Sequence, residues 1–341
     1  MKIGVLLSGG VDSTVAAYLL KEQGYEIEAI TMENGEYSFL EAAQKSAAEL
    51  GISHHVINLR KLFEEKVIDY FCQTYARGET PNPCTVCNRH IKFSALLDYA
   101  KALGCEKIAT GHYAILDYDS SSGRYQLRKG TDTAKDQSYF LYGLTQEQLS
   151  YTIFPLGALT KENVKAIAEK MGFQSLKQDE SQEICFIKGD YRHFLEGKIP
   201  ANPGKIIDIS GNHLGNHQGV AKYTIGQRKG LGVSWKHPLY VIDLDPVKNL
   251  VIVGGENNLY NKVCWAADNN FVSISGLNEP VYAKARIRYR AAEAVAWLTP
   301  ENNLVKVEFD EPQRAITKGQ AIVYYSGDTV IGGGRILECR M

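Results

Sequence analysis

Apolar and polar positions follow two different periods along the first half of the chain. Short apolar runs are typical of buried parallel strands, and they predict strands at 3–7, 26–32, 52–59 and 107–110. The stretches between these runs have apolar residues at helical spacing, and they predict helices from Val11 to the stop at Gly24 and at 39–50, 62–75 and 91–103. Strands that alternate with helices predict an α/β domain with a doubly wound parallel sheet.

The second half changes character after one more helix, which we expect from Glu162 to Met171 with Gly172 as its stop. The proline-rich segment Pro200–Gly204 is typical of a boundary. Beyond it we expect a hairpin from 240–244 and 250–253 and short strands at 281–289, 293–298, 304–309, 321–325 and 329–331. We therefore expect an α/β domain at 1–197, a small α+β linking domain at 198–262 and a C-terminal β-barrel at 263–341.

Composition narrows the class of protein without naming a partner. The 341 residues are 44% hydrophobic and 23% charged, which is ordinary for a soluble globular protein and excludes a disordered tail, a collagen-like repeat and a coiled-coil rod. The formal net charge is −1, so contact with a nucleic acid would have to come from local patches. With no signal-like or membrane-spanning run, we expect a cytoplasmic protein without a membrane partner.

The first candidate for chemistry is the segment Ser8-Gly9-Gly10-Val11-Asp12-Ser13, between the first strand and the first helix. Glycines let the backbone approach an anion, and the helix N-terminus supplies N–H donors and partial positive charge. Asp12 would repel a bare phosphate, so it indicates either a Mg²⁺ bridge or a helix cap. The segment is neither a Walker A loop nor a dinucleotide fingerprint. A tight turn with a good cap is the ordinary alternative.

The second candidate is a set of three among the seven cysteines. Cys84 and Cys87 form a Cys-x-x-Cys pair, and Cys185 follows at a distance. Half of a structural zinc site and a dithiol redox pair are two interpretations. The third is sulfur chemistry by a cysteine of lowered pKa, because we expect a helix to begin at about Asn88 with Arg89 and Lys92 nearby. We interpret Cys72, Cys105, Cys264 and Cys339 as small buried hydrophobes.

Several ordered motifs resemble one family, the tRNA-specific 2-thiouridylases, over essentially the whole chain. They are the Ser8–Ser13 loop, Thr80–Asn88 with Lys92-Phe93, Ala109–Tyr113, Lys135–Tyr139, Ile184–Ile187, Tyr223–Arg228, and Glu311–Ile316 with Gly319-Gln320. The resemblance implies a Rossmann-like PP-loop domain that uses ATP, a linking domain and a C-terminal barrel. It also implies a reaction in which ATP adenylates the 2-oxygen of a wobble uridine in tRNA and a sulfur nucleophile then displaces AMP.

The resemblance also implies the site residues. It places ATP, with Mg²⁺, against Leu6, Leu7, Ser8, Gly9, Gly10, Val11, Asp12, Ser13, Met32 and Gly111. It assigns Cys87 as the nucleophile and Cys185 as the carrier of a persulfide, which a sulfur-donor protein would supply. It assigns contact with the tRNA or its target base to Asn82, Pro83, Cys84, His112, Lys135, Asp136, Gln137, Arg288, Tyr289 and Gln320. Arginines alternating with Tyr289 over 286–290 would suit phosphate contact and base stacking, or simply a solvent-facing strand.

The chain departs from the family pattern at position 84, where Cys84 stands in place of the usual Asp. The segment after Met32 is also short, and Glu180–Cys185 replaces a more common Ser-Thr-Gly-Ile-Cys. Cys84, Cys87 and Cys185 are three thiols, the number that would hold a [4Fe–4S] cluster with one open iron, so a persulfide and a cluster-bound sulfide remain two alternatives. A PP-loop enzyme that transfers an amine, or a tRNA-binding protein without catalysis, are alternatives from other classes.

Overall fold

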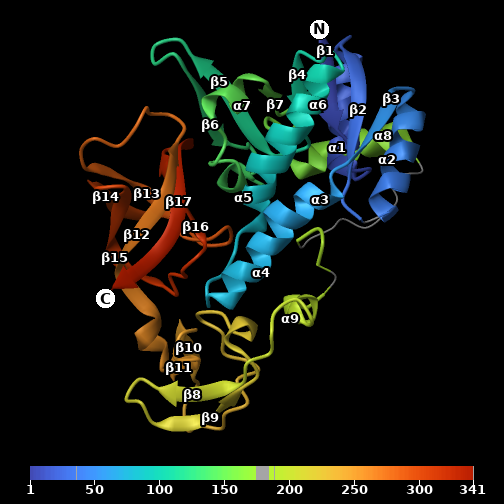
Figure 1. Ribbon diagram of the computed structural model, residues 1–341. Coiled ribbons are helices and arrows are strands. Elements are labelled where there is room, and N and C mark those ends of the chain that lie inside the picture. The colour runs from blue at the N-terminus through green and yellow to red at the C-terminus, as the bar shows by residue number, and fades with distance from the viewer. Residues whose placement is uncertain (36, 174–183, 188, 341) are drawn as a thin grey trace.

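The computed structural model describes residues 1–35, 37–173, 184–187 and 189–340. Figure 1 shows three bodies: an α/β body in blue and green, a small yellow sheet, and an orange-to-red barrel that holds the C-terminus. In the described part of the chain, no helix has the length and apolar character needed to cross a lipid bilayer. Residues 180–183, part of the segment where the chain departs from the family pattern, lie outside the described residues.

The α/β body is built on a five-stranded parallel sheet with the order β3-β2-β1-β4-β7. Its strands are β1 (Lys2–Leu6), β2 (Glu26–Glu33), β3 (Ser53–Asn58), β4 (Lys107–Ala109) and β7 (Thr152–Ile153). Because β1 pairs with β2 on one side and with β4 on the other, the chain order reverses at β1. Ligands of open α/β sheets bind at the carboxyl ends of the strands beside such a reversal. The Ser8–Ser13 loop follows β1 at this position.

Helices follow the strands of this sheet along the chain, much as the sequence predicts. They are α1 (Val11–Glu22), α2 (Tyr37–Leu50), α6 (Leu96–Ala102) and α8 (Lys161–Met171). The α8 helix ends at Gly172 in a left-handed conformation, as expected for a glycine stop. The buried apolar residues of β1, α1 and α2, among them Val5, Ala17 and Ala43, form one core cluster.

Two helical stretches differ from prediction because both contain π-helical turns. The first runs through α3 (Arg60–Phe63), η1 (Glu64–Ile68) and α4 (Asp69–Ala76). The second runs through α5 (Pro83–Cys87), η2 (Asn88–Ala95) and α6. The expectation that the second begins near Asn88 is wrong: it begins at Pro83, whose fixed φ suits the first turn of a helix. Cys87 therefore ends α5 and lies a full turn from the N-terminus of this stretch.

A hairpin that the sequence did not predict extends the C-terminal sheet. It consists of β5 (Ala114–Asp119) and β6 (Arg124–Lys129), and β6 pairs with the last strand through Arg128 and Thr329. Two short helices, η3 (Ser138–Phe140) and α7 (Gln146–Ser150), contact β6 of this hairpin. A third, η6 (Glu256–Leu259), lies just before the barrel.

The middle body is a four-stranded sheet with the order β10-β11-β8-β9. Its elements are α9 (Tyr191–Leu195), β8 (Gly204–Asp208), β9 (His213–His217), η5 (Val220–Lys222), β10 (Tyr240–Asp245) and β11 (Leu250–Gly254). The predicted hairpin is confirmed as the antiparallel pair of β10 and β11. Its core cluster includes the fully buried residues Ile206, Val241, Val251 and Val253.

The C-terminal body is a closed barrel, which confirms the expected β-barrel. Its strands are β12 (Tyr260–Phe271), β13 (Val281–Arg286), β14 (Ala294–Glu301), β15 (Leu304–Arg314), β16 (Ala321–Ser326) and β17 (Thr329–Arg340). They follow the order β12-β15-β14-β13-β16-β17, and a further pairing of β12 with β17 closes the ring. Closure removes the exposed strand edges of the sheet.

The largest core cluster crosses the border between the α/β body and the barrel. Phe93, Leu127 and Tyr139 from the first body pack in one buried group with Val323 and Tyr325 of β16. The hydroxyl of Tyr139 donates a hydrogen bond of 2.8 Å to the carbonyl of Ala321. The barrel is therefore fixed against the helices that carry Cys84 and Cys87.

Candidate active site

The Ser8–Ser13 loop turns tightly between β1 and α1, and Gly9 makes the turn. Gly9 has φ +77°, and a Cβ there would lie 2.4 Å from the backbone of Ala42 and Ala43 in α2. Only glycine tolerates both the positive φ and the lack of space for a Cβ. The N-cap of α1 is Gly10, which has no side chain to cap the helix. The first N–H groups of α1 therefore point toward the loop, as an anion site requires.

Ser8 and Ser13 tie the two ends of this loop together. The backbone N–H of Ser8 donates to Oγ of Ser13 at 3.2 Å, and the two hydroxyl oxygens lie 3.1 Å apart. Ser13 also donates its hydroxyl to the carbonyl of Gly10 at 3.1 Å. These bonds shape the loop before any ligand binds.

Asp12 is held by two residues from distant elements. Its Oδ1 lies 2.6 Å from Nζ of Lys161, the first residue of α8, and accepts a hydrogen bond of 2.8 Å from the hydroxyl of Tyr113. Lys161 is 7% exposed although it is a lysine. Sequence reasoning missed Lys161, because a lysine at the start of a helix usually faces solvent. The structure thus adds a buried cation to the loop.

Gly111 and Met32, which the resemblance assigns to ATP, lie on two sides of the loop region. A Cβ on Gly111, just after β4, would lie 2.8 Å from the backbone of Asp12 and Ser13. Gly111 therefore lets the β4 segment contact the first turn of α1. Met32, near the end of β2, is partly buried and packs against the core cluster that includes Cys87.

Cys84, Cys87 and Cys185 come together on one side of this site. Ile184, Phe186 and Ile187 pack in the same apolar cluster as Cys87 and Ile91. Charge on Cys185 raises the pKa of both Cys84 and Cys87, which shows that the three thiols lie near one another. Cys185 is exposed, whereas Cys87 is 8% exposed.

The expected lowered pKa of Cys87 is wrong. Burial raises the pKa of its thiol to about 12, and the positive charge of Lys92 offsets only part of this effect. Burial likewise raises the pKa of Cys84 to about 11. The helix N-terminus that would have favoured a thiolate lies at Pro83 instead, and an apolar surrounding disfavours the charged form.

The three thiols do not fit a preformed cluster site. No group of three or more His, Cys, Asp or Glu side chains among the described residues is arranged to hold a metal ion. Cys87 instead packs against Phe186 and Ile91. We therefore derive no step through an iron–sulfur cluster.

His112 lies between the loop and the cysteines. Its ring contacts Phe93 and Phe154 at centroid distances of 6.1 Å, and its Nδ1 lies 2.8 Å from Oγ1 of Thr110. Burial lowers the pKa of His112 well below its usual value. The ring is therefore neutral near pH 7, so any contact with tRNA would be a hydrogen bond or a stacking contact.

Several of the other assigned tRNA contacts make bonds within the protein. Asp136 is 2% exposed and accepts hydrogen bonds from the backbone of Gly130 and Ser138. Gln137 accepts one from the backbone of Tyr113, and Arg288 donates to the carbonyls of Arg314 and Ala315.

The remaining residues assigned to tRNA contact differ in their exposure to solvent. Lys135 is exposed and Tyr289 is half-buried, with its ring 4.5 Å from that of Phe140. Asn82 and Pro83 are buried at the start of α5. Gln320 donates a hydrogen bond of 3.1 Å to the carbonyl of Pro81. Lys135 and Tyr289 thus remain accessible on this side of the molecule.

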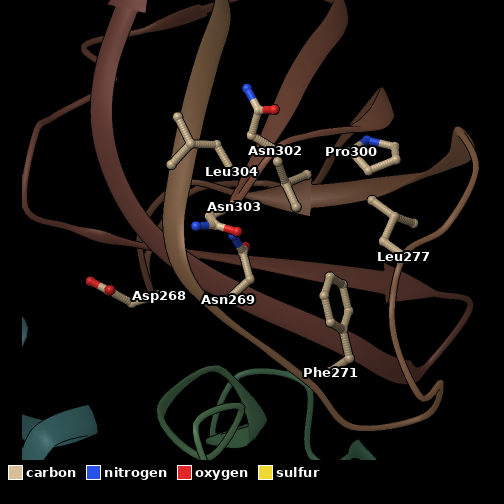
Figure 2. Close-up of a pocket in the computed structure, with 9 residues that line it drawn as sticks. Asp268, Asn269, Phe271, Leu277, Pro300, Asn302, Asn303 and Leu304 are labelled. Carbon is tan, nitrogen blue, oxygen red and sulfur yellow. The ribbon is translucent and has the colours of Figure 1, made fainter.

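A cavity of about 400 Å³ lies on the barrel, away from the loop (Figure 2). Polar side chains Asp268, Asn269, Asn302 and Asn303 line it together with Phe271 and Leu277. None of these belongs to the residues that sequence analysis assigned. The residues that sequence analysis assigned lie elsewhere, at the Ser8–Ser13 loop with Lys161 and in the group of Cys84, Cys87 and Cys185.

Comparisons with known proteins match the chain from end to end. Three protein-family models match in order: a tRNA methyl transferase HUP domain at 1–189, a tRNA methyl transferase PRC-barrel domain at 192–255 and an aminomethyltransferase beta-barrel domain at 261–336. The chain is 49% identical to the tRNA-specific 2-thiouridylase MnmA of Syntrophomonas wolfei, over 98% of this chain and 100% of that one. It is 50% identical to that of Moorella thermoacetica, over 97% and 98% of the two chains.

Proposed function

This chain belongs to the tRNA-specific 2-thiouridylase family, and we propose that it replaces the 2-oxygen of a wobble uridine in tRNA with sulfur, at the expense of ATP. The observation that carries the proposal is the convergence of an anion-binding loop and a cysteine group beside one reversal point of the sheet. Neither feature alone would distinguish thiolation from other uses of ATP.

The loop would bind the phosphates of ATP. Backbone N–H groups of Gly9, Gly10 and the first turn of α1 suit phosphate oxygens, and the Lys161 ammonium adds a positive charge in a nearly buried position. Asp12 is the carboxylate that would hold the Mg²⁺ of ATP. The 2-oxygen of the uridine attacks the α-phosphorus, the bond to the β-phosphate breaks, and pyrophosphate leaves with the electron pair.

The cysteines would deliver the sulfur. Cys185 is exposed, so a donor protein can load it with a persulfide. The terminal sulfur attacks carbon 2 of the adenylated uridine, and AMP leaves with the bonding pair. Cys87 then attacks the Cys185 sulfur, which releases the 2-thiouridine and leaves a Cys87–Cys185 disulfide. An external thiol reduces that disulfide for the next turnover.

The raised pKa of Cys87 affects the last of these reaction steps, in which its sulfur is the nucleophile. A thiol with pKa about 12 is almost entirely protonated near neutral pH, so Cys87 must lose its proton when it attacks. In the free protein this protects Cys87 from oxidation and alkylation. Binding of tRNA would be expected to change its surroundings before the sulfur step.

The test separates the two halves of the reaction. The protein is incubated with ATP and a tRNA transcript that has a wobble uridine, after loading with a persulfide donor. AMP and 2-thiouridine are then measured. We expect Asp12→Ala to abolish AMP formation, and Lys161→Met to lower it about 100-fold, the effect typical of losing one electrostatic partner of a reacting group.

The cysteine variants test the sulfur half. With pyrophosphate measured as well, we expect Cys87→Ser to release pyrophosphate and AMP, and Cys185→Ser to release pyrophosphate and stop at the adenylated tRNA. Neither variant should form free 2-thiouridine, while the barrel variant Cys339→Ser keeps all three products. Normal thiolation by Cys87→Ser or Cys185→Ser would refute the relay. Iron-free protein should thiolate fully from the persulfide. Activity that requires anaerobic reconstitution with iron and sulfide would replace the relay by a cluster on Cys84, Cys87 and Cys185.

A further inference from the structure

The turn between β15 and β16, which we call the barrel turn (Ala315–Gln320), contacts the segment that leads into the cysteines. The carbonyl of Lys318 accepts a hydrogen bond of 2.8 Å from the backbone N–H of Thr80. The side-chain amide of Gln320 donates one of 3.1 Å to the carbonyl of Pro81. Both bonds act on the residues that come directly before α5.

The barrel turn and the Glu79–Thr80 segment are in close contact at Gly319. This glycine has φ +88°, and a Cβ there would lie 2.8 Å from Cβ of Glu79 and 2.9 Å from the carbonyl oxygen of Thr80. Backbone atoms cannot yield as a flexible side chain can. A methyl group at position 319 would therefore push the Glu79–Thr80 segment away.

The barrel turn is itself held from three sides. Gly319 donates its N–H to the carbonyl of Ile336 in β17 at 2.8 Å, and Ile336 donates back to Gln320 at 2.9 Å. Lys318 forms an ion pair of 3.1 Å with Asp243 of the middle sheet. Arg288 donates to the carbonyls of Arg314 and Ala315, at the start of the turn.

We propose that the barrel turn positions the Thr80–Asn82 segment, and through it Cys84 and Cys87, for the sulfur step. Gly319 and Gln320 are in this proposal positioning residues. The family resemblance assigns Gln320 to tRNA contact, whereas the geometry directs its amide to Pro81. The inference rests on the proposed function for its rate measurement, but its structural claim stands on the contacts alone.

The first test uses Gly319→Ala with Gly327→Ala as its matched control. Gly327 also has positive φ, at +58°, but a Cβ there would meet no atom within 4 Å in the described part of the chain. The control therefore carries the backbone strain without the collision. Three quantities are measured: the single-turnover rate of thiolation at saturating tRNA, the Kd for tRNA, and the alkylation rate of Cys84 in the free protein, resolved by peptide mass analysis.

We expect Gly319→Ala to lower the single-turnover rate at least tenfold, since a displacement of about 1 Å near reacting groups can cost 100-fold. The Kd for tRNA should stay within twofold, and alkylation of Cys84 should rise severalfold as its segment loosens. Gly327→Ala should leave all three unchanged. Equal effects of the two variants, or unchanged Cys84 alkylation in Gly319→Ala, would overturn the proposal.

The second test removes only the hydrogen bond from Gln320. Gln320→Met keeps the length of the side chain, and Gln313→Met is its control because Gln313 donates to the nearby carbonyl of Glu311, two residues away. We expect a slower thiolation rate with unchanged Kd for Gln320→Met alone. A weaker Kd with an unchanged saturated rate would show tRNA contact instead and overturn the proposal. This test also decides the matter if Gly319→Ala does not fold.

Failure of the inference and failure of the proposed function give different results. If the wild-type protein does not thiolate tRNA, the proposed function fails while Cys84 alkylation still reports on the barrel turn. If it thiolates and none of the variants differs from its control, only the positioning role fails.

Discussion

The contacts and charge states of single residues at the site depend more on burial than on the neighbouring residues in sequence. Lys161 is held at Asp12 from 149 positions away, and no local pattern marks a lysine that is nearly buried. Burial also decides the state of Cys87, where it disfavours the charged form of the side chain. Nearby basic residues suggested a reactive thiolate, but its apolar surroundings raise its pKa instead.

The pKa of Cys87 leads to a prediction about pH. A thiol with pKa about 12 gains thiolate about tenfold per pH unit throughout the range below that value. We expect the alkylation rate of Cys87 in the free protein to rise about tenfold from pH 7 to 8 and again from 8 to 9, without a plateau. Peptide mass analysis after iodoacetamide treatment measures it. A plateau below pH 9 would contradict the pKa, and alkylation of urea-unfolded protein provides the control.

At the scale of elements, sequence periodicity predicted most of the α/β body and the barrel, because buried strands and amphipathic helices carry strong patterns. It failed for β5 and β6, whose largely polar or half-buried residues carry a weak strand pattern. It also misplaced the start of α5, where Pro83 begins the helix. The loop residues of the site were found because glycine and serine stand in a recognisable order, whereas the Lys161 contact depends on how α8 packs against α1.

The contact between the β4 segment and α1 predicts the effect of a single methyl group. In Gly111→Ala the new Cβ would lie 2.8 Å from the backbone of Asp12 and Ser13 and displace the Ser8–Ser13 loop. We expect AMP formation to fall at least tenfold at saturating ATP. The control is Gly276→Ala on the barrel, where the nearest atom to a new Cβ is Oδ1 of Asn278 at 4.0 Å. Normal AMP formation by Gly111→Ala would contradict this account.

At the scale of the whole molecule, the α/β body and the barrel share their largest core. Tyr139 and Leu127 pack with Val323 and Tyr325 across the border, and β6 pairs with β17. A boundary that buries a core cluster of this kind differs from the polar interfaces that let domains move independently.

The shared core predicts that these two bodies unfold together. Calorimetry should give one main transition for both, and Tyr325→Ala should lower the Tm of that transition as a whole. The reason is that loss of a fully buried aromatic ring lowers the free energy of unfolding by about 3–5 kcal/mol. The exposed Tyr118→Ala offers a control on the outer hairpin. Two separate transitions, of which Tyr325→Ala shifted only the barrel's, would show that the bodies fold independently.

The hydrogen bonds from Lys318 and Gln320 to Thr80 and Pro81 also bear on the order of synthesis. A ribosome makes the Ser8–Ser13 loop and the segment ahead of Cys84 before the barrel turn, and domains begin to fold as they emerge. In a nascent chain the segment ahead of Cys84 therefore lacks this support, and the core shared by the two bodies stays incomplete, until the barrel strands have been made. Under the proposed function, the barrel turn must therefore be synthesised before the chain can transfer sulfur.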